Sequence, residues 1–452
     1  MKSWGLALLL LVSMVQGVKA IRWTGGAGSS RWDDPANWED ARLPGPADEV
    51  ILDNRYVSGS YQVLLPDVAV SVGHIRMVAT AGAEILLLLP PTNLLAGAAG
   101  DPAAIALQLT GSGYVLDIEN GCSFINASGA ASGYALWLND SISVRNGGRY
   151  IHRSRTGHAA IVDKLSRMPG TAQGVFRFEN TDAASVISLS GRVFGRLELS
   201  AAYAPDRQVA YTAAGTSNAL IRSDLVLEEG VRFAFNFSDT IRILGNLEGR
   251  QAVLNLASAA RSLTLAIRKD IYWENGSIGA VNTNAATGLL LLAGDRQQQV
   301  SVNIPIGAGT TLALDNIQGC RSTGDLAVTH MLELKNGPLL LNEGSRLLLG
   351  PSAVVLCDSL NQHSYVEGII RKAAWSGAAL RFPVGKNNRQ RWIQLAGGAG
   401  DIEVAYYAAP SPGHPLAPGL DQVSALEYWS VLLPQPSPVQ VSLSFAKQPA
   451  GY

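Results

Sequence analysis

Hydrophobic and polar residues alternate with a period of two along most of the chain. In residues 231–237 every second side chain is a Val or a Phe, which places these apolar side chains on one face of an extended strand. Residues 263–268 and 300–306 alternate in the same way. Sustained helical spacing of apolar residues is lacking, and 47 glycines interrupt the stretches long enough for a helix. The pattern predicts an all-β protein built from half-buried strands.

Tight-turn signals separate these strands and recur in a common form. Asn-Gly preceded by a charged residue occurs at 119–121, 145–147, 274–276 and 335–337. Asn and Gly tolerate the positive φ that such turns need, but the spacing between the turns is irregular. Irregular coils of short strands predict a right-handed parallel β-helix over residues 57–355, in which each coil stacks its apolar side chains on the next. A string of β-sandwiches is the alternative that this pattern leaves open.

The composition changes at both ends of this region. Residues 21–56 contain three of the nine tryptophans: Trp23, Trp32 and Trp38. We expect them to pack as an N-terminal cap over the open end of the solenoid, although indole rings exposed there would stack on sugars. Residues 356–409 are predicted to form a small β-domain. The proline-rich residues 410–452 are predicted to be a linker and the start of an incomplete β-domain.

Residues 1–20 have the features of a secretory signal peptide. Lys2 supplies a positive charge, residues 6–15 are almost uniformly apolar, and Val18 and Ala20 occupy the −3 and −1 positions of a cleavage site. A membrane-spanning helix needs about 20 apolar residues, twice the length of this run. The sequence therefore predicts cleavage after Ala20. We expect a secreted protein with no transmembrane segment in the mature chain.

Charge and cysteine content exclude several classes of function. The chain has 35 basic and 36 acidic residues, so it lacks the basic excess of a nucleic-acid-binding protein, and we expect no nucleic-acid partner. Cys122, Cys320 and Cys357 are too few for a disulfide framework and are interpreted as small buried apolar residues. No C-x-x-C or H-E-x-x-H motif occurs, and neither a metal nor a cofactor is predicted.

Pairs of carboxylates are the first candidates for chemistry on a β-helix. A polysaccharide-cleaving enzyme needs two carboxylates facing one groove, or a basic residue near carboxylates that hold calcium. The acidic candidates are Asp33–Asp34, Glu228–Glu229 and Asp101. Adjacent residues on a strand point to opposite faces, so we interpret these residues as solvated turns and predict no catalytic residue.

A cationic segment at residues 150–158 is the candidate for binding an extracellular acidic polysaccharide. The side chains concerned are His152, Arg153, Arg155 and His158. The alternative is a loop that projects from the solenoid with its charges in water. Residues 389–392 are similar in composition, but Trp392 is expected in the core of the small β-domain.

Two sets of short motifs stand near the ends of the chain. The first comprises Trp-Thr-Gly-Gly at 23–26, Ser-Arg-Trp-Asp-Asp-Pro-Ala-Asn-Trp at 30–38, Leu-Pro at 43–44 and Asp-Glu-Val-Ile-Leu at 48–52. The second lies at 364–372, 382–385 and 428–430. The first set resembles the opening of the adhesin-like β-helical region of Bacteroidota-type surface proteins exported by the type IX secretion system, and the second resembles the small β-domain that follows the helix in them. The resemblance implies a secreted or bacterial cell-surface protein and no particular reaction. Family members usually continue to a C-terminal sorting domain, so we interpret the chain as truncated.

Two functions are compatible with these features. The long series of apolar strands and the low content of charged residues favour a non-catalytic, adhesin-like scaffold with weak glycan binding. The alternative is a polysaccharide lyase or glycoside hydrolase on a parallel β-helix, which requires ionisable groups that converge on one groove.

Overall fold

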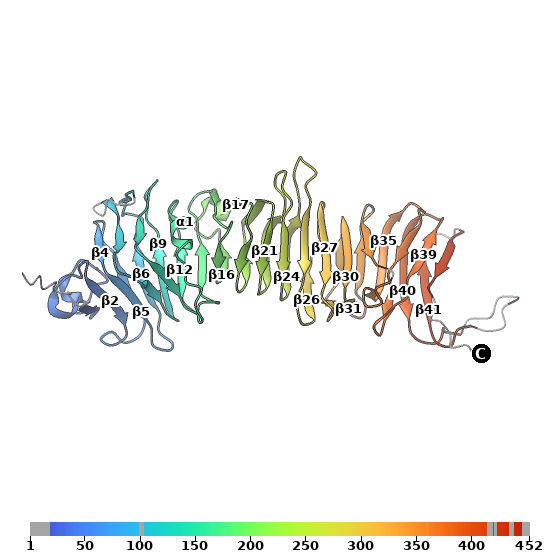
Figure 1. Ribbon diagram of the computed structural model, residues 1–452, viewed down its shortest axis with the longest axis horizontal. Helices are drawn as coiled ribbons and strands as arrows, with labels where there is room; N and C mark the ends of the chain where they lie inside the picture. Colours follow the sequence, from blue (N-terminus) through green and yellow to red (C-terminus); the bar gives the residue numbers. More distant parts are fainter. Residues whose placement is uncertain are drawn as a thin grey trace, which may run out of the picture.

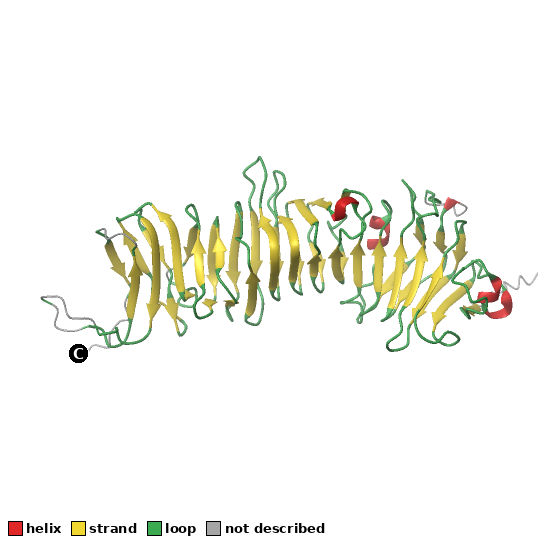
Figure 2. Ribbon diagram, turned by 180° about the vertical axis from the view of Figure 1, so that it is seen from behind, coloured by secondary structure: helices red, strands yellow, loops and turns green. Residues whose placement is uncertain are grey.

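The computed structural model describes residues 19–98, 104–358, 360–413, 419, 423–433 and 438–444. The protein is 48% strand and 4% helix, and its strands form a parallel β-solenoid of about 13 turns. Figures 1 and 2 show these coils stacked side by side along one elongated body. The prediction of an all-β parallel β-helix is confirmed.

Three parallel sheets form the N-terminal coils, and each coil contributes one strand to each sheet. The first sheet contains β1 (Lys19–Arg22), β2 (Asp48–Asp53), β5 (His74–Val78), β8 (Tyr114–Ile118) and β11 (Ser141–Val144). The second begins with β3 (Tyr61–Leu64), β6 (Ile85–Leu89), β9 (Cys122–Asn126) and β12 (Arg149–His152). The third contains β4 (Val70–Val72), β7 (Leu107–Leu109) and β10 (Leu136–Leu138).

The second sheet continues through most of the molecule. Its further strands are β13 (Val175–Phe178), β16 (Arg196–Leu199), β19 (Leu225–Leu227), β22 (Leu247–Asn255), β24 (Ile271–Gly279), β26 (Gln298–Val302), β28 (Cys320–Ser322), β31 (Leu339–Leu341) and β34 (Val366–Glu367). A branch of β14 (Ala184–Val186), β17 (Val209–Gly215) and β20 (Val231–Phe237) joins it at β22. The short helix α1 (His158–Val162) follows β12.

Another sheet of eight parallel strands covers the later coils. It contains β15 (Val193–Phe194), β18 (Ala219–Ile221), β21 (Thr240–Ile243), β23 (Thr264–Ile267), β25 (Gly288–Leu292), β27 (Thr310–Asp315), β30 (Met331–Asn336) and β33 (Val354–Cys357). The long strands β22 and β24 bend at Gln251 and Asn275, whose φ values are 46° and 61°. The bend lets the first half of β22 pair with β19 and its second half pair with β20.

Inward-facing side chains form the core because they stack in register from coil to coil. Leu265 pairs with Leu290, Leu290 with Leu312, and Leu312 with Leu332, and all four are buried. The alternation predicted for residues 231–237 is confirmed, since every Val and Phe of β20 is buried. Each such side chain contributes about 1.5–3 kcal/mol through removal of apolar surface from water.

The three N-terminal tryptophans are buried, as predicted for a packed cap. The ring of Trp38 meets those of Trp23 and Trp32 edge-on, with centroids 5.0 and 4.7 Å apart. The Trp38 indole N–H donates a hydrogen bond to the Trp32 carbonyl at 2.7 Å. The predicted boundary at residue 57 is wrong, because β1 and β2 within residues 19–56 already pair in parallel with the next coil.

The C-terminal boundary also differs from the prediction. The parallel stack runs beyond residue 355, because β34 pairs in parallel with β31, and β35 (Ile369–Trp375) continues the parallel pair of β29 (Leu326–Val328) and β32 (Arg346–Leu349). Antiparallel strands follow: β36 (Leu380–Phe382), β37 (Gly385–Lys386), β38 (Arg389–Gln390), β39 (Ile393–Ala396) and β40 (Gly400–Tyr407). Strands β41 (Tyr428–Leu432) and β42 (Gln440–Leu443) pair with β40 and β39. The described strands of 410–452 therefore belong to the sheets of residues 369–407 and do not form a separate β-domain as predicted.

The predicted signal-peptide run lies outside the described residues except for its last two positions. Among the residues that the structure describes, no helix has the length and apolar character needed to cross a membrane.

Truncating a core aromatic tests the stacked interior. We expect Phe235→Ala to lower the free energy of unfolding by about 3–5 kcal/mol, because it removes a fully buried ring that packs 4.2 Å from the ring of Phe233. Urea denaturation measures this loss. Val281→Ala, at a side chain that is 72% exposed, is the control and changes the stability by less than about 0.5 kcal/mol. Equal midpoints for both variants would contradict the core position of Phe235.

Candidate functional site

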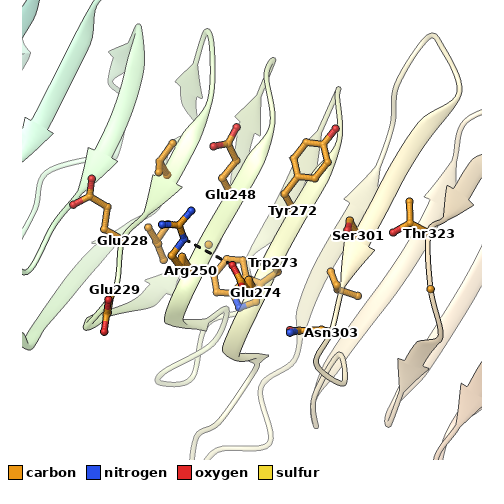
Figure 3. Close-up of a pocket in the computed structure, with 15 residues that line it drawn as sticks. Glu228, Glu229, Glu248, Arg250, Tyr272, Trp273, Glu274, Ser301, Asn303 and Thr323 are labelled. Atoms are coloured by element: carbon orange, nitrogen blue, oxygen red, sulfur yellow. Dashed lines mark ion pairs between the residues drawn. The ribbon is translucent and has the colours of Figure 1, made fainter.

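A groove with a volume of about 960 Å³ lies on the outer face of the long sheet, over the coils of β19, β22, β24, β26 and β28. Figure 3 shows the side chains that line it. A second hollow of about 510 Å³ lies beside it, and Glu228 and Glu229 line both.

The register of the strands arranges the outward-facing side chains of the groove in two columns. The first column is Val226, Glu248, Tyr272 and Ser301, each paired with the next across neighbouring strands. The second column lies two residues further along each coil and contains Glu228, Arg250, Glu274 and Asn303. Figure 3 shows both columns on the same surface.

The floor of the groove depends on a glycine. Gly249 is a buried position of β22 on the side of the strand that faces the interior of the solenoid. A Cβ at this position would lie 2.4 Å from Cε3 of the Trp273 ring. The buried indole of Trp273 thus occupies the space above Gly249. Any larger residue at 249 would displace this ring and with it the strand that carries Tyr272 and Glu274.

The groove is acidic. Its lining includes four carboxylates and one guanidinium: Glu228, Glu229, Glu248, Glu274 and Arg250. The Arg250–Glu274 ion pair has an N···O distance of 3.8 Å, and its side chains are 74% and 65% exposed, so it contributes little to stability. The Tyr272 hydroxyl donates a long hydrogen bond to Asp270, with an O···O distance of 3.3 Å.

A partly buried network of ion pairs lies next to the groove and includes Glu228. The Arg177 guanidinium bonds Glu179 at 2.6 Å, Glu198 at 3.0 Å and Glu228 at 2.5 and 2.7 Å. Arg153 extends the network from Glu179 on one side, and Arg196 extends it from Glu198 on the other. The network links the successive coils of β12, β13, β16 and β19.

The network fixes the charge of its members. Burial alone would raise the pKa of Glu228, but the hydrogen bonds and charge of Arg177 outweigh this effect and lower the pKa. Burial alone would lower the pKa of Arg177, and the carboxylates of Glu228 and Glu179 reverse that shift and raise the pKa. Both groups therefore remain charged at neutral pH.

The segment predicted to bind acidic polysaccharide is largely part of the core. His152 is buried on β12, and its ring lies 5.6 Å from that of His158. Burial, with a smaller contribution from His158, lowers the pKa of His152 to about 3. Burial, with a smaller contribution from Arg192, lowers the pKa of His158 to about 4. The alternative of a projecting loop with its charges in water is wrong for His152, because β12 directs that ring inward.

The two arginines of the same segment are ion-paired. Arg153 bonds Glu179 at 2.7 Å and lies over the ring of Tyr203, 3.5 Å from its centroid. Arg155 pairs with Asp182 at 3.0 Å, and its side chain is about half exposed. Polysaccharide binding here stays a prediction, and Arg155 is the member of the four whose charge is most open to solvent.

The predicted carboxylate pairs have separate outcomes. Asp33 pairs with Arg31 at 2.9 Å, and Asp34 accepts a hydrogen bond from the Ala36 N–H at 3.1 Å, as expected of turn residues. Asp101 lies outside the described residues. The interpretation of Glu228 as a solvated turn residue is wrong, because it pairs with Arg177.

The sequence analysis missed Glu248 and Tyr272 as groove residues. The first column recurs at positions 226, 248, 272 and 301, so its intervals are 22, 24 and 29 residues. Such unequal coil lengths conceal the column from any search for a fixed repeat. The detectable signal was the alternation of polar and apolar residues within each strand.

The structure also places the three cysteines and Trp392. Cys122 and Cys320 are buried and Cys357 is half-buried, and burial raises the pKa of Cys122 and of Cys357 to about 12. Trp392 is half-buried beneath Arg381, 4.4 Å from its ring centroid, and is not fully in the core as expected. No cluster of three or more His, Cys, Asp or Glu residues suited to a metal ion occurs in the part of the chain that the structure describes.

Removing the central arginine tests the network. We expect Arg177→Gln to lower the free energy of unfolding by about 3 kcal/mol at pH 7, because it leaves three carboxylates without their shared partner. The folded pKa of Glu228 lies below its unfolded value of about 4.3, so the stabilisation exists above that pH and is lost as the pH falls through the folded pKa. The difference between the two proteins should therefore shrink below about pH 4.3.

Urea denaturation across a pH series measures that difference. Arg250→Gln, which removes the exposed pair with Glu274, is the control and should change the stability by less than about 0.5 kcal/mol. A constant difference between Arg177→Gln and the unaltered protein from neutral pH to pH 3 would show that the carboxylates do not depend on Arg177.

Comparison with protein-family models, curated proteins and solved structures finds no match for this chain. The resemblance of the tryptophan-rich opening and of residues 364–372 to type IX-exported surface proteins therefore stays a prediction. The fold alone does not determine the reaction or ligand, because one architecture serves many functions. The arguments that follow rest on the geometry of the outer face.

Proposed function

We propose that the protein is a non-catalytic, adhesin-like scaffold that acts outside the cell or at its surface. The observation that carries the proposal is the use of charge on the long sheet, where Arg153, Arg177 and Arg196 each pair with a carboxylate of the next coil. These groups connect coil to coil and stabilise the solenoid. A solenoid of about 13 turns, whose neighbouring coils are joined by ion pairs, suits a protein that presents a long surface.

The carboxylates of the groove support a scaffold more than a hydrolase. A general acid needs a raised pKa, which enzymes obtain by placing a carboxyl group in a dry, apolar site. The Glu274 side chain is 65% exposed and lies beside Arg250. Arg177 lowers the pKa of Glu228, which favours the charged form and opposes the role of proton donor.

The extracellular location rests on the sequence. The apolar run at residues 6–15 and the small residues before Ile21 support export through the general secretory route. Surface display by type IX export is the part of the proposal that depends on family resemblance.

Assays on a panel of polysaccharides test the absence of catalysis. The purified chain is incubated with neutral and acidic polymers, and the formation of new reducing ends and of unsaturated products is measured. We expect neither product above the background of a heat-denatured sample. Turnover that disappears in Glu248→Gln or Glu274→Gln, with the fold retained, would establish the glycosidase or lyase alternative and reject the scaffold.

N-terminal sequencing tests the proposed location. When the complete chain is expressed in a bacterium with a secretory pathway, the exported protein should begin at Ile21. Lys19→Asp preserves the apolar run and is expected to leave export intact, whereas Leu9→Arg interrupts the run and should retain the protein in the cell. Recovery of exported protein that begins at Met1 would contradict the signal peptide.

A further inference from the structure

We infer that the groove over β19, β22, β24, β26 and β28 binds a linear, uncharged polysaccharide whose sugar units follow the coils. The inference goes beyond the scaffold proposal, since it assigns a ligand class and a site. It also relocates glycan binding from the cationic segment at 150–158, where His152 is buried, to an acidic and open face.

The dimensions of the groove match an extended polymer. Neighbouring coils of a parallel solenoid lie about 4.8 Å apart, so the five coils of the groove cover roughly 19 Å. One pyranose unit of an extended 1,4-linked glycan advances by a closely similar distance. Each coil can thus present equivalent positions to successive sugars. The volume of about 960 Å³ lies within the range of binding sites for small ligands and oligomers.

The two columns supply the groups that recognise sugars. Tyr272 is 37% exposed, and the hydrogen bond to Asp270 holds its ring in place for contact with the C–H face of a pyranose. Glu248 and Ser301 flank it in the first column, and Glu274 lies two residues further along the same strand. Carboxylate and hydroxyl oxygens at these positions can accept hydrogen bonds from sugar hydroxyls.

Charge excludes an acidic polymer. The lining contains four carboxylates and one guanidinium, and Arg177 neutralises the first of the four, Glu228. The remaining three carboxylates face Arg250 alone among the lining cations. A polyuronate would meet like charge over the coils of β19, β22 and β24, which opposes its association.

The acidic charge of the groove would attract a basic peptide, but the side-chain spacing of a peptide does not match the spacing of the coils. An extended peptide presents side chains on one face every 6.8 Å or so, twice the rise of about 3.4 Å per residue. The columns of the groove repeat about every 4.8 Å. Successive basic side chains would therefore move out of register with Glu248 and Glu274 within two coils. A neutral glycan keeps its register with the coils and uses Tyr272 as well.

Binding measurements on the full chain test this inference. Calorimetric titration uses three probes: a neutral β-1,4-linked hexasaccharide, an oligogalacturonate and an oligolysine. We expect binding of the hexasaccharide, with little dependence on salt, and no binding of the oligogalacturonate. Tyr272→Ala should weaken hexasaccharide binding about tenfold, because it removes the stacking surface. Tyr272→Phe keeps the ring and should bind nearly as well as the unaltered chain.

Tyr114→Ala is the matched control, because Tyr114 is 38% exposed on β8 of a different sheet. It should bind the hexasaccharide unchanged, and urea midpoints establish that each variant is folded. Salt-sensitive binding of oligolysine alone would overturn the inference in favour of a cationic partner. Binding of oligogalacturonate, absence of binding, or equal affinities of Tyr272→Ala and Tyr114→Ala would also overturn it.

The outcomes for the two proposals are distinguishable. Cleavage of a neutral glycan would reject the non-catalytic scaffold and leave the ligand class of the groove intact. Failure of all three probes to bind would reject the groove as a glycan site and leave the scaffold proposal untouched.

Discussion

Stacking of parallel coils is the constraint on which the rest of the structure depends. Each side chain meets the side chain at the same position of the neighbouring coil, about 4.8 Å away. An apolar residue such as Leu290 is stabilised by this arrangement, because Leu265 and Leu312 lie on either side of it. A polar residue in an interior column needs a hydrogen-bond partner, because burial without one costs several kcal/mol. Ser322, between Val300 and Leu341, donates a hydrogen bond to the Gly324 carbonyl at 2.8 Å, and most other members of the interior columns are apolar.

The same constraint acts on polar groups at the surface. Like charges in neighbouring coils repel, and Arg153 and Arg177 each pair with a carboxylate of the next coil, Glu179 and Glu198 respectively. Before the strands, short polar side chains accept hydrogen bonds from the backbone of the next coil. The Asn246 N–H donates to Asp224 at 2.8 Å, and the Asp270 N–H donates to Asn246 at 3.2 Å. Polar atoms at the coil boundaries are thus satisfied by the neighbouring coil, which keeps the stack in register.

Period-two alternation predicted the fold class, because the faces of a strand such as Val231–Phe237 are decided by its own sequence. It did not predict where the stack begins and ends, because the pairing of β1 and β35 depends on partners distant in the sequence. The same rule, applied fully, would have placed His152 inside. His152 lies two residues after the buried Tyr150 and shares its face. The density of charge in that segment was the misleading feature.

The groove shows why a site on a solenoid is harder to predict than its core. Core columns tolerate any apolar residue, so their pattern survives unequal coil lengths, whereas a site requires particular side chains on neighbouring coils. Glu248 and Tyr272 come together only because β22 and β24 pair in register, 24 residues apart. The site also begins where the ion-pair network ends. Glu228 is the carboxylate of this network that lines the groove, and the coils beyond it place Tyr272 and Ser301 in the first column. Tyr272 and Ser301 line the groove and are not part of the network around Arg177.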